Sequence, residues 1–387
     1  GPRRTGTVLH ASLGAVVRTE VPMRRWIVLR EGSRLRWGGD LRRRYVYDGI
    51  ARLPGAIVQE DWRVGTLRRT LAASSSRWLP WRRAYLASTE TLVDEQIVTV
   101  TPWVVPAVVD IHDEPVIQAD ALGIPLSPSD REAMRLRLRR NLDLFQLWTI
   151  PSAALGDLIG LDRERVVVAP NGTRTDVVEP APWPPEPAVG FVSGAAPNRG
   201  IEVLIAAVRL VREMIPETRL HLWLAATGER SASYLDDLRA SLGRDPLTHI
   251  GSVHYSELGQ ALGQVWAFVI PTPAHPYWET VAPIKLFDAM AAGRPIVVTP
   301  RRETASVVDG AGAGLVAAGD EPGDLASAIL ALLRDPDGAR RMGEAARRAA
   351  VARHDWRAIA ANVATAVLDR LATKRRAHWH RLLPRRT

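Results

Sequence analysis

Short apolar runs alternate with segments of helical periodicity along most of this chain. AFVI (Ala267–Ile270) and PIVVT (Pro295–Thr299) are apolar and bounded by Pro or Gly, as buried parallel strands are. Gly293 and Pro295 end a predicted helix between them, whose apolar residues recur at helical spacing: Ile284, Phe287, Met290 and Ala291. This alternation predicts an α/β protein with doubly wound parallel sheets.

The pattern divides the 387 residues into two Rossmann-like domains facing a cleft. EPAPWPPEP (Glu179–Pro187) has five prolines in nine positions, which predicts a stiff linker at residues 179–188. The remaining segments are an N-terminal extension (1–22), a first domain (23–178), a second domain (189–356) and, after a final helix, a basic tail (372–387).

The loop and helix between AFVI and PIVVT form the main candidate site. Open α/β sheets bind ligands beyond the carboxyl ends of their strands, and helix N-termini bind anions. Lys285 and Asp288 lie on the first turns of this helix, with Glu279 just upstream. A carboxylate placed there can accept hydrogen bonds from a ribose diol. Taken alone, Lys285 or Asp288 would fit an ordinary strand-loop-helix unit with solvated charges. The whole stretch from Pro271 to Pro300 favours a nucleotide site.

PIKLFDAMAAGRPIVVT resembles the nucleotide-sugar loop of retaining GT-B glycosyltransferases, specifically family 4. That family's pattern has two glutamates eight positions apart, the second followed by Ala-Met-Ala-x-Gly-x-Pro. Asp288 stands at the second glutamate and Thr280 at the first, while Glu279 misses the first by one position. The chain looks most similar to a subgroup with Pro-x-Lys-Leu-Phe-Glu that lacks the first acid, which normally contacts the donor sugar.

The resemblance extends to other loops. Gly38-Gly39 corresponds to glycines beside the donor diphosphate, and His112 to a histidine beside the reacting carbon. Arg199-Gly200 corresponds to a Lys-Gly or Arg-Gly diphosphate site, although Ala195 stands where the family often has an earlier arginine. Without the resemblance, each of these residues has a simpler alternative role. The glycines could form a tight turn, the histidine could be structural, and the arginine could be a solvated side chain.

The resemblance implies a retaining hexosyltransferase-type enzyme that uses a nucleoside diphosphate-sugar as its donor substrate. Arg199, Lys285 and the Gly38-Gly39 amides would neutralise the leaving diphosphate, and His112 would line the sugar. Asp288 would bind the ribose, with Gly200 and Glu279 also on the donor side. The final helix, residues 357–371, would return to the first domain. We expect neither a cofactor nor a metal site, and the acceptor (small molecule, glycan or lipid-linked) stays open.

Composition limits the partners and leaves an alternative. The net charge is +9, and 49 of the 51 basic residues are arginine, which permits phosphorylated substrates, nucleic acid or anionic membrane. A nucleic-acid- or anionic-surface-binding protein on an α/β scaffold is therefore the alternative. The arginines are dispersed over both halves, so no nucleic-acid partner is expected. Neither half has the Gly-x-Gly-x-x-Gly of a nicotinamide-binding oxidoreductase, and the lack of cysteine fits the cytoplasm.

Two segments combine arginine with aromatic residues and suggest a peripheral membrane contact. RWLPWRRAYL (Arg77–Leu86) and the tail Lys374–Arg386 place tryptophan among basic side chains, as interfacial segments do. For the first segment an amphipathic surface helix is the favoured alternative, because the stretch is short and contains Pro80. For the tail the alternative is a solvated terminus.

Overall fold

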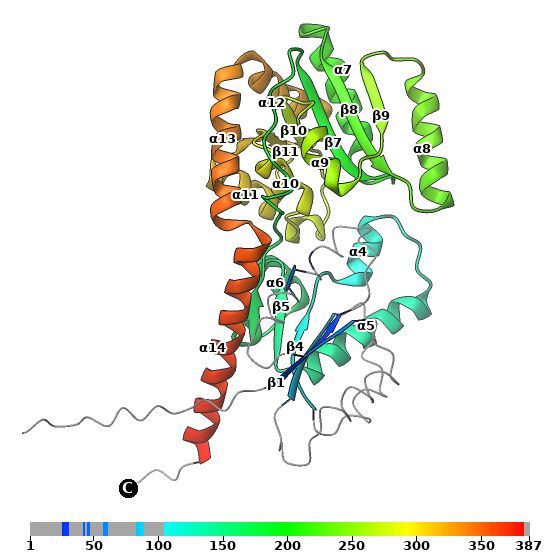
Figure 1. The fold of residues 1–387 in the computed structure, drawn as a ribbon. Coiled ribbons are helices and arrows are strands. Elements are labelled where there is room, and N and C mark those ends of the chain that lie inside the picture. Colours follow the sequence, from blue (N-terminus) through cyan, green and yellow to red (C-terminus); the bar gives the residue numbers. More distant parts are fainter. Residues whose placement is uncertain are drawn as a thin grey trace, which may run out of the picture.

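The computed structural model describes residues 25–30, 42, 45–46, 57–60, 83–88 and 104–382. Two six-stranded sheets dominate them, one in each half of the chain (Figure 1). All strand pairs within these sheets are parallel. The α/β fold class with two Rossmann-like domains is therefore confirmed.

The first sheet has the order β2-β1-β3-β4-β5-β6. Its strands are β1 (Arg25–Arg30), β2 (Ile57–Glu60), β3 (Arg83–Ser88), β4 (Val104–Asp110), β5 (Leu147–Ile150) and β6 (Val166–Val168). Its helices are α4 (Pro115–Ala121), α5 (Pro128–Leu144), α6 (Ala153–Ile159) and the 3₁₀ turn η1 (Arg163–Arg165).

The second sheet has the order β12-β11-β10-β7-β8-β9. Its strands are β7 (Ala188–Gly194), β8 (Arg219–Ala225), β9 (Thr248–Gly251), β10 (Ala267–Ile270), β11 (Ile296–Val298) and β12 (Gly314–Val316). Its helices are α7 (Ile201–Met214), α8 (Glu229–Leu242), α9 (Leu258–Leu262), α10 (Ile284–Ala291), α11 (Arg302–Ala311), α12 (Pro322–Arg334) and α13 (Pro336–Arg353), with 3₁₀ turns η2 (Tyr255–Glu257) and η3 (Trp278–Thr280).

The core of the second half is built on β7, β10 and β11. All four residues of β10 and all three of β11 are buried, which explains why their sequences show no polar alternation. Phe191, Phe268 and Phe287 are among the largest buried side chains, and they belong to one hydrophobic cluster. This packing holds the loops at the carboxyl ends of β7 and β10 on rigid supports.

Strand β3 corrects one prediction. Arg83–Leu86 was expected to belong to an amphipathic helix or an interfacial segment, but β3 lies between β1 and β4 in the sheet. Its backbone pairs with both neighbours, so hydrogen bonds across the sheet override the local amphipathic pattern. The rest of that segment, residues 77–82, lies outside the described residues.

Helix α14 (Trp356–Leu382) leaves the second half and runs along the first (Figure 1). Trp356, Ile359 and Val363 pack in a hydrophobic cluster with Val108 and Leu147 of the first sheet. The predicted helix end at Leu371 is wrong, because the chain contains no Gly or Pro between Leu371 and Leu382 to stop the helix. None of the described helices is long and apolar enough to cross a membrane.

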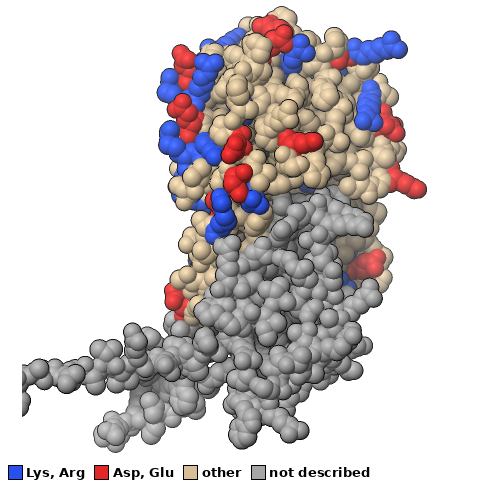
Figure 2. Space-filling model, viewed as in Figure 1, with Lys and Arg blue, Asp and Glu red and all other residues tan. Residues whose placement is uncertain are grey.

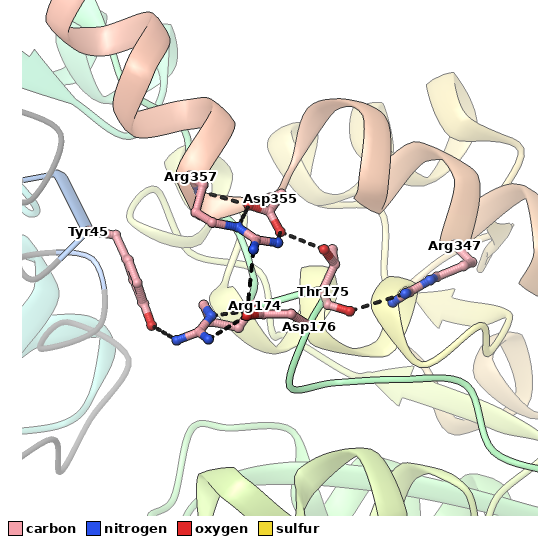
Figure 3. Close-up of polar contacts among 7 residues, drawn as sticks. All are labelled: Tyr45, Arg174, Thr175, Asp176, Arg347, Asp355 and Arg357. Carbon is pink, nitrogen blue, oxygen red and sulfur yellow. Dashed lines mark hydrogen bonds and ion pairs between the residues drawn. The ribbon is translucent and has the colours of Figure 1, made fainter.

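Polar contacts attach the start of α14 to the segment that joins the two halves (Figure 3). Asp355 accepts hydrogen bonds from Thr175 Oγ1 (2.5 Å) and from the guanidinium and backbone N–H of Arg357. Arg174 donates to Asp176 and to the hydroxyl of Tyr45 at 2.8 Å. Arg347 of α13 donates to the carbonyls of Thr175, Val178 and Ala291. These contacts connect α13 and α14 with residues 174–178, directly before the linker.

Candidate functional site

Two cations lie at the starts of the helices that follow the adjacent strands β7 and β10 of the second half. Arg199 ends the loop that follows β7, directly before Gly200 and α7. Lys285 is the second residue of α10. Both helices therefore present their N-terminal ends next to a basic side chain, an arrangement that favours anions.

Neither cation forms an ion pair with an acidic side chain in the described part of the chain. The Arg199 guanidinium lies 5.3 Å from the centroid of the Trp278 ring, and its buried Nε has no hydrogen-bond partner among the described residues. The Lys285 ammonium lies 4.3 Å from the Phe191 ring. Among the described residues, no ion pair involves Arg199 or Lys285. Two aromatic faces thus hold two cations without neutralising them.

Burial makes this pair electrostatically costly. Burial lowers the pKa of Arg199, opposed by nearby Tyr277 and Asp113. Burial also lowers the pKa of Lys285 well below its usual value, and the positive charge of Arg199 lowers it further. The positive charge of Arg199 therefore lies close enough to Lys285 to disfavour a second positive charge there. An anion bound between them would relieve both penalties.

Gly200 allows the loop before α7 to approach the loop after β10. Its φ of +77° lies in the left-handed region, which glycine adopts without strain. A Cβ at this position would lie 1.7 Å from the carbonyl oxygen of Pro271, the first residue after β10. Gly200 therefore brings Arg199 and the donor loop (residues 271–283) together.

Three consecutive residues of the donor loop point to three different partners. The Tyr277 hydroxyl donates to Asp113 Oδ1 of the first half (2.6 Å), and Trp278 lies against Arg199. Glu279 Oε1 accepts from Arg301 (2.8 Å), and its Oε2 accepts from the Arg302 backbone N–H at the start of α11 (2.7 Å). In contrast to the predicted donor contact, Glu279 thus faces α11 and holds the loop in place. Thr280 is buried.

Asp288 is buried at the junction between the halves. Its Oδ1 accepts a hydrogen bond from Thr173 Oγ1 (2.7 Å), in the turn that ends the first half, and lies 3.4 Å from the Tyr255 hydroxyl. Burial raises the pKa of Asp288 to about 7, although both hydroxyls oppose the shift. The predicted ribose contact would have to come from Oδ2, because Oδ1 is engaged inside the protein.

This raised pKa predicts how pH affects stability. Between about pH 4 and pH 7 the folded protein retains a proton on Asp288 that the unfolded chain releases. Stability from this group is therefore greatest at low pH and falls as the pH rises to about 7. We expect Asp288→Asn to remove this decline, a change of up to about 4 kcal/mol between the two pH limits.

Urea unfolding of the wild type and of Asp288→Asn from pH 4.5 to 7.5 measures the effect as the difference between their free energies of unfolding. The contributions of the other titrating groups cancel in this difference. Asp309→Asn, an exposed carboxylate on α11, is the control. An equal pH dependence for wild type and Asp288→Asn would contradict the prediction.

His112 and Asp113 lie just beyond the carboxyl end of β4, where the sequence places them. His112 Nδ1 lies 3.0 Å from Asp113 Oδ2. Burial lowers the pKa of His112, but the charge and hydrogen bond of Asp113 outweigh it, so the pKa is raised overall. His112 therefore carries a positive charge more readily than a free histidine does.

A buried ion pair that the sequence did not reveal supports this strand end. Arg42 and Asp110 are fully buried, with Arg42 Nη2 2.8 Å from Asp110 Oδ1. Thr149 Oγ1 also donates to Asp110 (2.7 Å), and Arg42 donates to the Ala169 carbonyl. From the sequence, only the position of Asp110 at the end of a strand could be predicted. No sequence feature distinguishes Arg42 from the other arginines of the chain.

The structure brings most of the predicted residues to one junction. Ser152 Oγ donates to the Thr280 carbonyl (2.7 Å) and Asn171 Nδ2 to the Ala282 carbonyl (2.9 Å), so first-half loops contact both ends of the donor loop. Tyr277 connects this loop to the His112-Asp113 pair.

Tyr277, Trp278 and Asp113 were not predicted as site residues, although Tyr277 and Trp278 directly precede Glu279. Gly38 and Gly39 lie outside the described residues. Within the described part, no cluster of three or more acidic or histidine side chains suits a metal ion.

The fold is that of the GT-B glycosyltransferases, as comparison with solved structures shows. Sucrose-phosphate synthase from Thermosynechococcus elongatus superposes with a TM-score of 0.69 over 90% of this chain and 100% of its own, at 16% identity. Anabaena HepE in complex with UDP gives a TM-score of 0.65 over 89% of this chain and 100% of its own, also at 16% identity.

Sequence comparisons indicate the same class. Residues 186–335 match the family model described as glycosyl transferases group 1. A D-inositol 3-phosphate glycosyltransferase from Nocardia farcinica is 27% identical over 259 residues, 62% of this chain and 56% of that protein. A glycogen synthase from Mycobacterium tuberculosis is 26% identical over 229 residues, 56% of this chain and 52% of that protein. The matches therefore span little more than half the length of these relatives.

Proposed function

We propose that this protein is a retaining glycosyltransferase that transfers a sugar from a nucleoside diphosphate donor to an acceptor. The observation that carries the proposal is the pair Arg199 and Lys285. Burial and the charge of Arg199 lower the pKa of Lys285, and neither side chain has an ion-paired carboxylate among the described residues, so the pair offers a site for a doubly charged anion. A donor diphosphate has this charge, and it gains more negative charge as the sugar departs.

The other residues take roles consistent with their positions. Asp288 Oδ2 would accept from the nucleotide ribose, while Thr173 holds Oδ1. His112, across the junction between the halves, would line the sugar. The amides at the start of α7, beside Gly200, would add donors for the phosphates. Retention is part of the proposal because the loop around Lys285 resembles that of retaining enzymes.

The alternative of nucleic-acid binding is less well supported. On the face shown in Figure 2, acidic side chains of the second half stand among the basic ones, with no continuous basic surface. Several arginines of this half are paired with carboxylates, such as Arg212 with Asp245 and Arg301 with Asp320. A nucleic-acid site would instead gather unpaired basic residues along one surface.

A screen of UDP-, GDP-, ADP- and TDP-sugars by thermal shift tests the proposal. UDP compounds come first, because the similar HepE structure contains UDP. At a ligand concentration of about 100 Kd, binding should stabilise the fold by about 2.7 kcal/mol. The bound phosphates should raise the lowered pKa of Lys285, so binding should take up protons at any pH between the pKa of Lys285 in the free protein and its pKa in the complex.

Calorimetry in two buffers of different ionisation enthalpy measures this proton uptake. The Lys285→Met variant, which cannot titrate at this position, is the control. If no nucleoside diphosphate bound at millimolar concentration, the proposed enzyme activity would have no support.

A further inference from the structure

A chain of hydrogen bonds connects His112 to the donor loop across the two halves. His112 Nδ1 lies 3.0 Å from Asp113 Oδ2, and the Tyr277 hydroxyl donates to Asp113 Oδ1 at 2.6 Å. Gln118 Nε2 of α4 in turn donates to the Tyr277 hydroxyl (2.9 Å). Tyr277 is buried, and the His112 and Asp113 side chains are only 19% and 13% exposed. Both carboxylate oxygens of Asp113 are therefore engaged, one from each half.

This geometry determines which nitrogen His112 offers to a ligand. Ionised Asp113 can accept hydrogen bonds but cannot donate them, so the Nδ1 atom of His112 that faces it carries the proton. In the neutral ring Nε2 is then the free acceptor, and in the charged ring it is a donor. A carboxylate that holds one ring nitrogen in this way orients the ring and stabilises its charged form.

We propose that Asp113 is a positioning residue for His112, and that Tyr277 of the donor loop holds Asp113 in place. The assignment deepens the proposed function and rests on it for its relevance to sugar transfer. His112 would be correctly oriented only when the donor loop contacts the first half. The donor site and the sugar-lining residue would therefore be assembled in one step.

The surrounding charges favour the same arrangement. Asp110 of β4 adds to the effect of Asp113 on the pKa of His112, while Arg42 and burial oppose it. Burial raises the pKa of Asp113, but His112 and the hydroxyl of Tyr277 lower it by more. The pKa of Asp113 is therefore lowered overall, and its carboxylate remains ionised at neutral pH. The pKa of Tyr277 is raised mainly by burial and further by Asp113 of the first half, while Gln118 and, from the second half, Arg199 lower it. A phenol with a raised pKa stays protonated and remains a hydrogen-bond donor to Asp113.

NMR of the histidine rings in the full chain tests the assignment without any substrate. His112→Gln identifies the His112 signals. In Asp113→Asn we expect the pKa of His112 to fall below the wild-type value, because burial then acts without the adjacent charge. In Tyr277→Phe we expect faster exchange of the Nδ1 proton with water. Tyr234→Phe removes another hydroxyl-carboxylate bond, from Tyr234 of α8 to Glu202 in the first turn of α7, and should change neither value.

An unchanged pKa of His112 in Asp113→Asn would overturn the role of Asp113. A Tyr277→Phe spectrum identical to that of Tyr234→Phe would overturn the role of Tyr277. With a donor identified, both variants should lower kcat about ten- to a hundredfold while donor KM changes little, and Asp113→Asn should shift the limb of the pH profile that reports the titration of His112 to lower pH. The expected NMR result without transfer from any donor would refute the proposed function but leave the positioning assignment intact.

Discussion

Replacing Arg199 or Lys285 with alanine is expected to lower sugar transfer by about 30- to 1,000-fold, or about 2–4 kcal/mol of barrier. Each side chain would contact negative charge that grows as the diphosphate leaves, so its loss affects the transition state more than the bound donor. Steady-state kinetics should therefore show a fall in kcat as well as in kcat/KM.

The same substitutions should leave the fold as stable as the wild type or more stable. Both cations are desolvated, repel each other and lack an acidic partner among the described residues, so the free protein loses little when one is removed. Unchanged or higher melting temperature together with lost turnover is typical of a residue kept for function.

Arg209→Ala, an exposed arginine on the same helix as Gly200, is the matched control and should change neither property. Near-normal turnover in both Arg199→Ala and Lys285→Ala would remove the proposed diphosphate site. A large loss of stability in either variant would instead indicate a structural role.

Asp110→Ala is expected to destabilise the protein by about 3–5 kcal/mol, because it leaves the buried guanidinium of Arg42 without its carboxylate. Thr149 Oγ1 also loses its acceptor in the interior of the first sheet. The energetic cost comes from an uncompensated charge rather than from the value of the pair itself. Urea unfolding followed by circular dichroism measures it.

The double variant Arg42→Met with Asp110→Leu separates the cost of the unpaired charge from the stability that the ion pair itself contributes. If the cost is that of an unpaired charge, removing both partners should recover most of the lost stability. Asp120→Ala, which breaks an exposed ion pair with Arg131, is the control and should have little effect. A loss for Asp110→Ala no larger than that for Asp120→Ala would contradict the prediction.

The sequence by itself determined the class of fold. Strands such as β10 and β11 are short and continuously apolar, and α10 between them has its apolar residues at helical spacing. Such signals are local, because each element buries a surface that its own residues define. The position of Arg199 and Lys285 at helix starts was also visible, because it depends only on where a strand ends and a helix begins.

The tertiary structure alone decided which partners these residues have. Glu279 is close in sequence to the predicted donor-binding residues, yet its carboxylate binds Arg301 and the start of α11. Asp288 contacts Thr173, and Tyr277 contacts Asp113, each across more than a hundred positions of sequence. Arg83 belongs to a central strand because β1 and β4 pair with it. Contacts between residues distant in sequence depend on how the two domains pack, and a local pattern of hydrophobic and polar residues carries no record of that packing.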